Sequence, residues 1–233
     1  LLLAVVLLPG QNGITRENWR EYGGDARSWR YSGLDQVNTS NVKRLIPAWQ
    51  FQTGDYEGGL QATPIVDDGV MYLSTSRNRV FALNAATGQQ IWRYDYVLPD
   101  GFNTFYGPWN RGVAIDSERV FMGTLDNPVV ALNRKRMCCA QHGILNRKTG
   151  QELWNVDVED WKQCGCNITA APLVVKDKVI VGVTGGDSAH RGYLNAFNVR
   201  TGRLEWRFWT IPGPGEKGHD TWKGESWKYG GGS

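Results

Sequence analysis

Histidine is scarce in this sequence, which has three in 233 residues. So few imidazole groups disfavour a metal site built mainly from histidine. The four cysteines, Cys138, Cys139, Cys164 and Cys166, form a CC pair and a CxC pair, and neither pair has the spacing of a zinc site. The sequence leaves open whether either pair is a disulfide or two free thiols. Four cysteines suit an oxidising compartment.

Blocks of like charge are also absent. The chain has 26 basic and 23 acidic side chains, a formal net charge of +3, and no run of five or six like charges. This mixed pattern gives no indication of a nucleic-acid or polyanion binder.

The sequence contains no apolar run long enough to cross a membrane. Its longest, LLLAVVLL at residues 1–8, is followed by a Pro-Gly breaker. We interpret residues 1–10 as the remains of an export signal, because the run has the length of a signal-peptide core, although no basic segment precedes it. The alternative is a buried β-strand. An export signal predicts a periplasmic location, and whether the protein is also attached to a membrane stays open.

Glycine and tryptophan are abundant, with 29 and 11 residues. Three similar phrases, NAATGQQIW, NRKTGQELW and NVRTGRLEW, end at Trp92, Trp154 and Trp206. In each, Asn can cap a turn, Gly supplies a positive φ and Trp is a bulky strand residue. Each phrase therefore predicts a hairpin corner that enters a strand. Paired β-rich runs precede the corners, and Asp68-Gly69 between two such runs is a hairpin signal.

The repeat spacing predicts an all-β fold of the propeller type. Trp154 follows Trp92 by 62 residues and Trp206 follows Trp154 by 52, and about 50 residues is the period of a four-stranded blade. The longer interval contains NRK twice, so we expect residues 136–145 to be an exposed loop insertion. Residues 11–233 would then form about three to four blades, an incomplete propeller domain in which the three tryptophans are equivalent.

The Trp-ended phrase resembles the tryptophan-docking repeat of the PQQ-dependent (quinoprotein) alcohol dehydrogenases. GGLQATPIVDDGVMYLST, WNRGVAI, CNITAAPLVVKDKVIVGVTGGDSAHRGYL and DTWKGESWKYGGGS are similar to the site-bearing stretches of that family, in the same order. The resemblance implies an eight-bladed propeller that binds PQQ and Ca²⁺ or a lanthanide ion.

Carried over by position, the resemblance implies a set of cofactor-binding residues. Arg111 matches the arginine that pairs with PQQ, a ring system with three carboxylates. Trp222 matches the indole on which the quinone stacks. Hydroxyl and backbone donors around the carboxylates are matched by Thr169, Thr184, Gly185 and Gly186. Without the resemblance, all of these would pass for ordinary strand, turn and surface residues.

Four positions depart from the family pattern. Asp187 stands where the family has a glutamate ligand to the metal, and it is shorter by one methylene. Gln61, which we also assign to the cofactor site, stands where many members carry a glutamate. Phe105 and Tyr106 replace the two adjacent cysteines that many alcohol-oxidising members have.

The resemblance implies a periplasmic oxidoreductase that oxidises an alcohol or related hydroxyl substrate and passes electrons to cytochrome c. The family's catalytic base and a second metal ligand come from stretches that this sequence does not contain. We therefore assign no catalytic residue and expect no alcohol oxidation from the chain alone. Arg111, Thr169, Thr184, Asp187 and Trp222 should converge at the propeller axis. The alternatives are a non-catalytic propeller scaffold of the outer-membrane assembly type and a carbohydrate-binding propeller.

Overall fold

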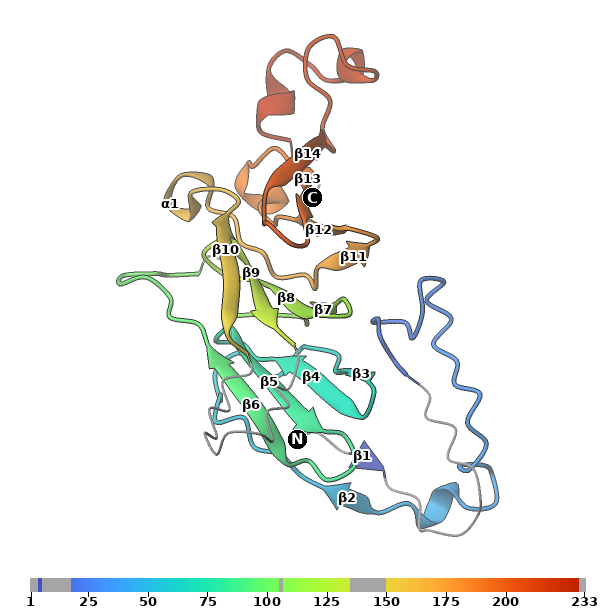
Figure 1. Ribbon diagram of the computed structural model, residues 1–233. Coiled ribbons are helices and arrows are strands. Elements are labelled where there is room, and N and C mark those ends of the chain that lie inside the picture. The colour runs from blue at the N-terminus through green and yellow to red at the C-terminus, as the bar shows by residue number, and fades with distance from the viewer. Residues whose placement is uncertain (1–3, 6–17, 105–106, 135–149, 231–233) are drawn as a thin grey trace.

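The structure, a computed structural model, describes residues 4–5, 18–104, 107–134 and 150–230. Within these ranges, three four-stranded antiparallel sheets follow one another along the chain, as Figure 1 shows. In each sheet the strands pair in sequence order, first with second, second with third and third with fourth. These sheets are the blades that the repeat predicts, so the all-β assignment and the partial propeller are confirmed.

The sheets have closely similar strand lengths. The first contains β3 (Ile65–Asp67), β4 (Val70–Ser74), β5 (Arg79–Asn84) and β6 (Gln90–Asp95). The second contains β7 (Ala114–Ile115), β8 (Arg119–Gly123), β9 (Pro128–Asn133) and β10 (Glu152–Asp157). The third contains β11 (Leu173–Val175), β12 (Lys178–Gly182), β13 (Tyr193–Asn198) and β14 (Leu204–Trp209). A short pair, β1 (Ala4–Val5) with β2 (Pro47–Trp49), precedes them.

Helices in the described residues are short. They are α1 (Trp161–Cys164) and the 3-10 turns η1 (Val42–Arg44), η2 (Gly186–Ser188), η3 (His219–Thr221) and η4 (Ser226–Lys228). In this part of the chain no helix has the length and apolar character needed to cross a membrane. Ala4 and Val5 pair with β2, and the rest of residues 1–10 lies outside the described residues, so the export signal stays a prediction.

The middle strands of the stack are buried on both faces. In β9, Val129 and Ala131 belong to the core shared with the third sheet, whereas Val130 and Leu132 belong to the core shared with the first. Successive side chains of a strand point to opposite faces. Because a sheet lies on each side, both sets must be apolar, which explains the uninterrupted apolar run of this strand.

The tryptophans of the three repeats occupy equivalent positions. Trp92 pairs with Ala82, Trp154 with Ala131 and Trp206 with Ala196, each between the third and fourth strands of its sheet. A register irregularity lies next to every one of these pairs. The predicted equivalence of the three tryptophans in successive sheets is therefore confirmed.

Each docked indole covers a glycine of the next corner. A Cβ on Gly150 would lie 2.7 Å from the Trp92 ring, and a Cβ on Gly202 would lie 2.9 Å from the Trp154 ring. The Trp154 indole also donates to the Val199 carbonyl at 3.1 Å. Only glycine leaves room for the ring, and the positive φ of both glycines also favours it. Trp206 ends the series with 41% of its surface exposed.

Trp49 is a further docking tryptophan that sequence reasoning missed. It ends β2, its indole donates to the Ala85 carbonyl at 3.2 Å, and its ring would lie 2.5 Å from a Cβ on Gly88. The Asn-x-x-Thr-Gly phrase does not precede it in the sequence. The signal that could have found it is the corner glycine at position 88, which needs an indole to cover it.

The corners show why Asn and Gly recur. Asn84 accepts hydrogen bonds at its side chain from the amides of Ala86 and Thr87, and its carbonyl accepts from Gly88. Asn198 makes the same contacts with Arg200, Thr201 and Gly202. The repeated phrase is thus a hydrogen-bonded turn followed by a docking strand.

In the second corner the asparagine is Asn133, not Asn146. The Gly150 amide donates to the Asn133 carbonyl at 3.0 Å, as Gly88 does to Asn84, and the Asn133 amide donates to Gln151. The corner is therefore closed between two residues that are 17 positions apart in the sequence. The expected insertion, residues 136–145, and the cysteines Cys138 and Cys139 lie outside the described residues.

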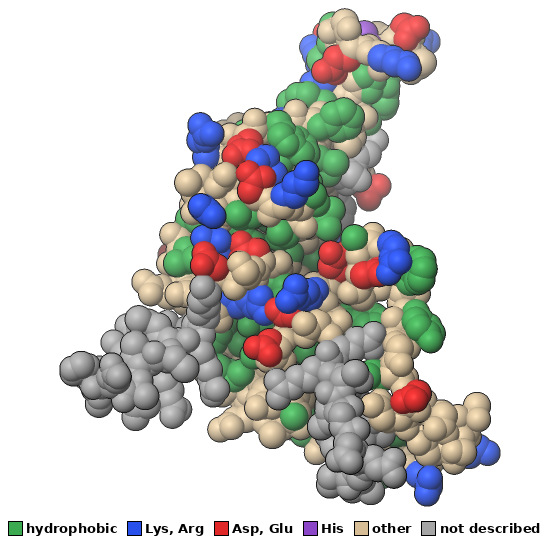
Figure 2. All heavy atoms as spheres, turned by 45° about the vertical axis from the view of Figure 1, so that its right-hand side comes forward, with side chains coloured by type: hydrophobic (Ala, Val, Ile, Leu, Met, Phe, Trp, Pro, Cys, Tyr) green, Lys and Arg blue, Asp and Glu red, His purple; other side chains and the backbone are tan. Residues whose placement is uncertain are grey.

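An ion-pair cluster joins the first two sheets at the edge where β3 ends. The Asp67 carboxylate accepts from Arg20 Nε at 2.6 Å and from Arg134, and its side chain is 4% exposed. Burial opposes ionisation, but the hydrogen bonds from the two guanidinium groups outweigh it and lower the pKa of Asp67 below 3.8. Elsewhere on the surface, Figure 2 shows basic and acidic side chains interspersed over the visible face.

The docking contact generates the first prediction. Gly202→Ala should lower the free energy of unfolding by about 2 kcal/mol or more, because the new methyl group strains a left-handed residue and displaces the Trp154 ring. Gly69→Ala is the matched control, since Gly69 also has a positive φ but no atom within 4 Å of its Cβ position. Urea unfolding measures both. Equal losses in the two variants would contradict the docking role.

The Asp67 cluster generates the second prediction. A carboxyl whose pKa is depressed in the folded state contributes stability above its unfolded pKa and loses it as the pH falls through that range. At pH 7, Asp67→Asn should cost about 2 kcal/mol, and the difference from the unaltered protein should shrink as the pH falls below about 4. Urea midpoints between pH 3 and pH 7 test this, with Asp100→Asn as control. A difference that does not change with pH would be incompatible with the cluster.

Candidate functional site

One edge of the sheet stack carries nearly all of the candidate residues. Antiparallel strands reverse direction at every turn. The segment that enters the first strand of a sheet therefore lies at the same edge as the turn between its second and third strands. The candidates in the entering segments are Gln61 before β3, Arg111 before β7 and Thr169 before β11. Those in the β12–β13 connection are Thr184, Gly185, Gly186 and Asp187.

Arg111 and Thr169 are brought into direct contact although they belong to different sheets. Arg111 Nη1 donates to the Thr169 hydroxyl at 2.6 Å, and the Arg111 amide donates to the Thr169 carbonyl at 2.9 Å. Thr169 is buried and Arg111 is exposed. The pair therefore places an exposed guanidinium directly beside a largely buried hydroxyl at this edge.

Gly112 explains how the segments come so close. Its φ is 137°, and a Cβ there would lie 3.4 Å from the Ala171 methyl and 3.6 Å from the Thr63 carbonyl. The segments that enter β3, β7 and β11 thus meet around this glycine. Gln61 lies in the first of these segments, exposed and two residues before Thr63.

Two buried asparagines hold the entering segments, and sequence reasoning did not find them. Asn110 accepts from the Ser74 hydroxyl at 2.5 Å and donates to the Gly123 carbonyl at 2.9 Å. Asn167 donates through its side chain to the Leu125 carbonyl of the preceding sheet. Both are nearly inaccessible, at 3% and 4% exposure. The only sequence signal for these asparagines is that each lies shortly before a candidate residue.

Thr184 and Gly185 are fixed by the same segment as Thr169. The backbone amide of Asn167 donates to the Thr184 hydroxyl at 3.0 Å, and the Thr184 amide donates to the backbone carbonyl of Asn167 at 2.8 Å. Gly185 has a φ of 120°, and a Cβ there would lie 2.8 Å from the His190 Cβ. Both the backbone conformation and the crowding require glycine at this position.

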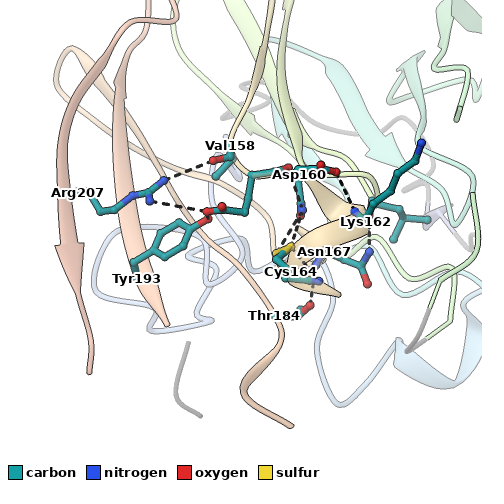
Figure 3. Close-up of a disulfide and its surroundings, with 12 residues drawn as sticks. Val158, Asp160, Lys162, Cys164, Asn167, Thr184, Tyr193 and Arg207 are labelled. Carbon is teal, nitrogen blue, oxygen red and sulfur yellow. Dashed lines mark hydrogen bonds and ion pairs between the residues drawn. A yellow bond between two sulfur atoms is a disulfide. The ribbon is translucent and has the colours of Figure 1, made fainter. Parts of the chain in front are cut away.

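The connection from β10 to β11, which includes Asn167, also contains a disulfide. Cys164 and Cys166 are bridged, with 5.1 Å between their Cα atoms, which resolves the question that the sequence left open for this pair. Figure 3 shows the bridge between α1 and the Asn167–Thr184 contact. Cys166 is fully buried. The pairing is compatible with an oxidising compartment.

Charged and aromatic groups support this connection on its other side. The Glu159 carboxylate accepts from the Tyr193 hydroxyl at 2.9 Å and lies 3.7 Å from Arg207 Nη1 (Figure 3). Burial, followed by the bond to Glu159, raises the pKa of Tyr193 above its usual value. Burial lowers the pKa of His190 below 6.5, so its imidazole is mainly neutral at pH 7 and adds no cation beside Gly185.

Asp187 offers one carboxylate for a metal ion. It lies in η2 and is exposed. Nowhere in the described ranges do three His, Cys, Asp or Glu side chains gather in an arrangement that could hold a metal. Asp187 is thus a single hard oxygen donor of the kind that Ca²⁺ prefers.

Trp222 lies in a separate segment from the Arg111–Thr169 pair. It follows η3 in the segment after β14, which Figures 1 and 2 show projecting beyond the third sheet. Its ring faces its own segment, where a Cβ on Gly230 would lie 2.4 Å away. The guanidinium carbon of Arg191 lies 4.1 Å from the ring centre of Trp209 and 4.9 Å from that of Trp227. Because Trp227 belongs to this segment and Trp209 to β14, the two contacts tie the segment to the third sheet. The convergence of Trp222 with the other candidates stays a prediction.

Comparison with known proteins identifies the family. Residues 19–233 match the family described as "Glucose/ethanol/alcohol dehydrogenase, beta-propeller domain". The quinoprotein alcohol dehydrogenase PedH of Pseudomonas putida is 40% identical over 219 residues, which are 87% of this chain and 34% of PedH. The quinohemoprotein alcohol dehydrogenase of Comamonas testosteroni is 35% identical over 234 residues, 95% of this chain and 31% of the relative.

Solved structures agree with the sequence relatives. A europium-containing methanol dehydrogenase matches with a TM-score of 0.77 and 33% identity, over 93% of this chain and 39% of the other. The quinohemoprotein alcohol dehydrogenase ADHIIG of Pseudomonas putida HK5 has the same TM-score with 35% identity, over 93% and 31%. The chain spans about a third of the length of the curated relatives it matches. With the three docked sheets and this match over most of its length, the chain belongs to the PQQ-dependent alcohol dehydrogenase family and contains part of its β-propeller domain.

Proposed function

We propose that this chain supplies part of the PQQ site of a periplasmic quinoprotein that oxidises an alcohol or a related hydroxyl substrate. The observation that carries the proposal is the contact of Arg111 with Thr169 at the edge where the entering segments meet. Relatives that are named quinoprotein and quinohemoprotein alcohol dehydrogenases support the reaction class.

Both threonine hydroxyls are arranged to donate. Thr169 Oγ1 accepts from Arg111 and Thr184 Oγ1 accepts from the Asn167 amide. A hydroxyl has one proton to donate, and neither of these two hydrogen bonds uses that proton. Each hydroxyl can therefore donate its proton to an anionic oxygen. Arg111 adds a planar cationic donor, which suits a carboxylate well.

These donors fit a carboxylate-bearing cofactor such as PQQ. Arg111, Thr169 and Thr184 would hold carboxylates, and the backbone of Gly185 and Gly186 would lie close to the cofactor. We further propose Trp222 as the aromatic face for the rings and Gln61 as a neutral polar group beside them. When bound, PQQ supplies the quinone that takes up the two electrons and the hydrogen from the alcohol carbon.

Asp187 would be one ligand of the accompanying Ca²⁺ or lanthanide ion. Its carboxylate is a hard donor on a short turn that follows Thr184 and Gly185 directly. Further carboxylate ligands would come from outside the described residues, because Asp187 belongs to no cluster of such side chains within them. We assign no general base to this chain, and we propose cytochrome c as the electron acceptor. The Cys164–Cys166 disulfide supports export to the periplasm.

The third prediction tests the binding role of Arg111. In the complete protein, Arg111→Lys should raise the Kd for PQQ about tenfold or more, because a charge-assisted contact contributes about 1.5 to 3 kcal/mol and an ammonium cannot reproduce the guanidinium geometry. Fluorescence titration of the apoprotein with PQQ and Ca²⁺ measures this constant.

Arg93→Lys is the matched control for that titration. Arg93 is paired with Asp95 on β6, which β4 and β5 separate from β3 and from the segment that carries Gln61, and its substitution should leave the Kd unchanged. If Arg111→Lys bound PQQ as tightly as Arg93→Lys, the assignment of Arg111 would be refuted.

A further inference from the structure

The Cys164–Cys166 disulfide lies at the start of the segment that holds the candidate site. Cys164 ends α1, Gly165 turns the chain with a φ of 59°, and Cys166 directly precedes Asn167. The bridge therefore closes a very short loop. Its second cysteine, Cys166, lies two residues before Ile168 and three before Thr169. A loop this short removes little entropy from the unfolded chain, so its effect on global stability should be small.

The bridge is anchored to the preceding sheet through Asn127. The side-chain amide nitrogen of Asn127 lies 3.3 Å from both sulfur atoms and also donates to the Glu159 carbonyl at 3.3 Å. Asn127 is fully buried in the β8–β9 turn with a φ of 83°. The side-chain amide of Asn127 thus contacts both cysteines of the bridge and the backbone between β10 and α1.

The other side of the bridge packs against the proposed cofactor-binding residues. The Cys166 Cβ lies 3.2 Å from the Cβ position of Gly185. The neighbouring Asn167 makes two hydrogen bonds with Thr184, one to its hydroxyl and one from its amide. Displacement of Cys166 would therefore move Asn167 and change both the hydroxyl of Thr184 and the backbone at Gly185.

Hydrogen bonds also act in this loop, but they hold its two halves separately. α1 is a single turn, and an isolated turn of helix is not stable in water. Asp160 accepts from the Lys162 amide at 3.0 Å, and the Gly165 amide donates to the Trp161 carbonyl at 3.1 Å, whereas Asn167 is held by the Leu125 carbonyl. The covalent link joins the end of α1 directly to the residue before Asn167.

We propose that the Cys164–Cys166 disulfide is a positioning element of the cofactor site, which holds Thr184 and Gly185 in place for cofactor binding through Cys166 and Asn167. This inference rests on the proposed function for its ligand. It makes PQQ affinity dependent on the bridge, although neither cysteine touches the cofactor in this account. Its effect should be seen in the order of the Thr184 segment and in cofactor affinity, more than in global stability.

The test uses the complete protein with Cys164→Ser, which breaks the bridge and leaves the buried Cys166 in its core as a small apolar side chain. Cys139→Ser is the matched control, because it also removes one cysteine but outside this segment. Hydrogen exchange of the apoprotein should be at least tenfold faster at the Thr184 and His190 amides in Cys164→Ser and unchanged in the control. The thermal midpoints of the two variants should agree within a few degrees.

Titration with PQQ and Ca²⁺ then tests the effect on binding. Cys164→Ser should raise the Kd about tenfold, and Thr184→Val should add little to that loss, because both changes remove the same contact. A Kd equal to that of the unaltered protein, or a Thr184→Val effect that is fully additive, would overturn the proposal. Where Cys164→Ser does not fold, Cys164→Ser/Cys166→Ala serves for the same measurements.

The two proposals fail in different ways. If the unaltered protein does not bind PQQ, the proposed function is refuted, whereas faster exchange at Thr184 would still support the positioning role. If PQQ binds and Arg111→Lys weakens it, but Cys164→Ser changes neither exchange nor Kd, the positioning role alone is refuted.

Discussion

The packing of a tryptophan on the corner glycine of the next sheet is the contact on which the structure depends. Trp92 on Gly150 and Trp154 on Gly202 set the distance and angle between consecutive sheets, and Trp49 on Gly88 does the same at the first sheet. Because the contact repeats, the sheets stack with their strands in equivalent positions. The segments that enter β7 and β11 are thereby brought close enough for Arg111 and Thr169 to share two hydrogen bonds.

The site edge is held by buried polar groups in addition to these apolar contacts. Asn110 links its entering segment to the preceding sheet through the Ser74 hydroxyl, and Asn167 does so through the Leu125 carbonyl. A buried amide contributes most when its partners are fixed by surrounding structure. This arrangement gives Thr169 and Thr184 defined acceptor contacts, which leaves their protons available for a ligand. Docked sheets thus determine the positions of the entering segments, and the asparagines determine how the donors on those segments are oriented.

The sequence predicted the repeated features well and the single ones poorly. Asn-x-x-Thr-Gly-x-x-x-Trp encodes a local turn and a strand, so the equivalence of Trp92 and Trp206 follows from nearby residues alone. The corner at Gly150 is closed by Asn133 across intervening chain, and no local pattern distinguishes Asn133 from Asn146. The contact of Asn167 with Leu125 and that of Asn127 with Cys164 likewise join different sheets. Resemblance supplied Arg111 and Thr169, while their direct contact was visible only in the structure.

The central claim is that the edge with Arg111, Thr169 and Thr184 binds the carboxylates of PQQ. An experimental structure of the complete protein with PQQ and Ca²⁺ tests it most directly. The account predicts a cofactor carboxylate within hydrogen-bonding distance of the Arg111 guanidinium and of at least one of the two threonine hydroxyls. A cofactor bound elsewhere, or an Arg111 side chain directed away from it while Thr169 and Thr184 contact only protein, would contradict the account.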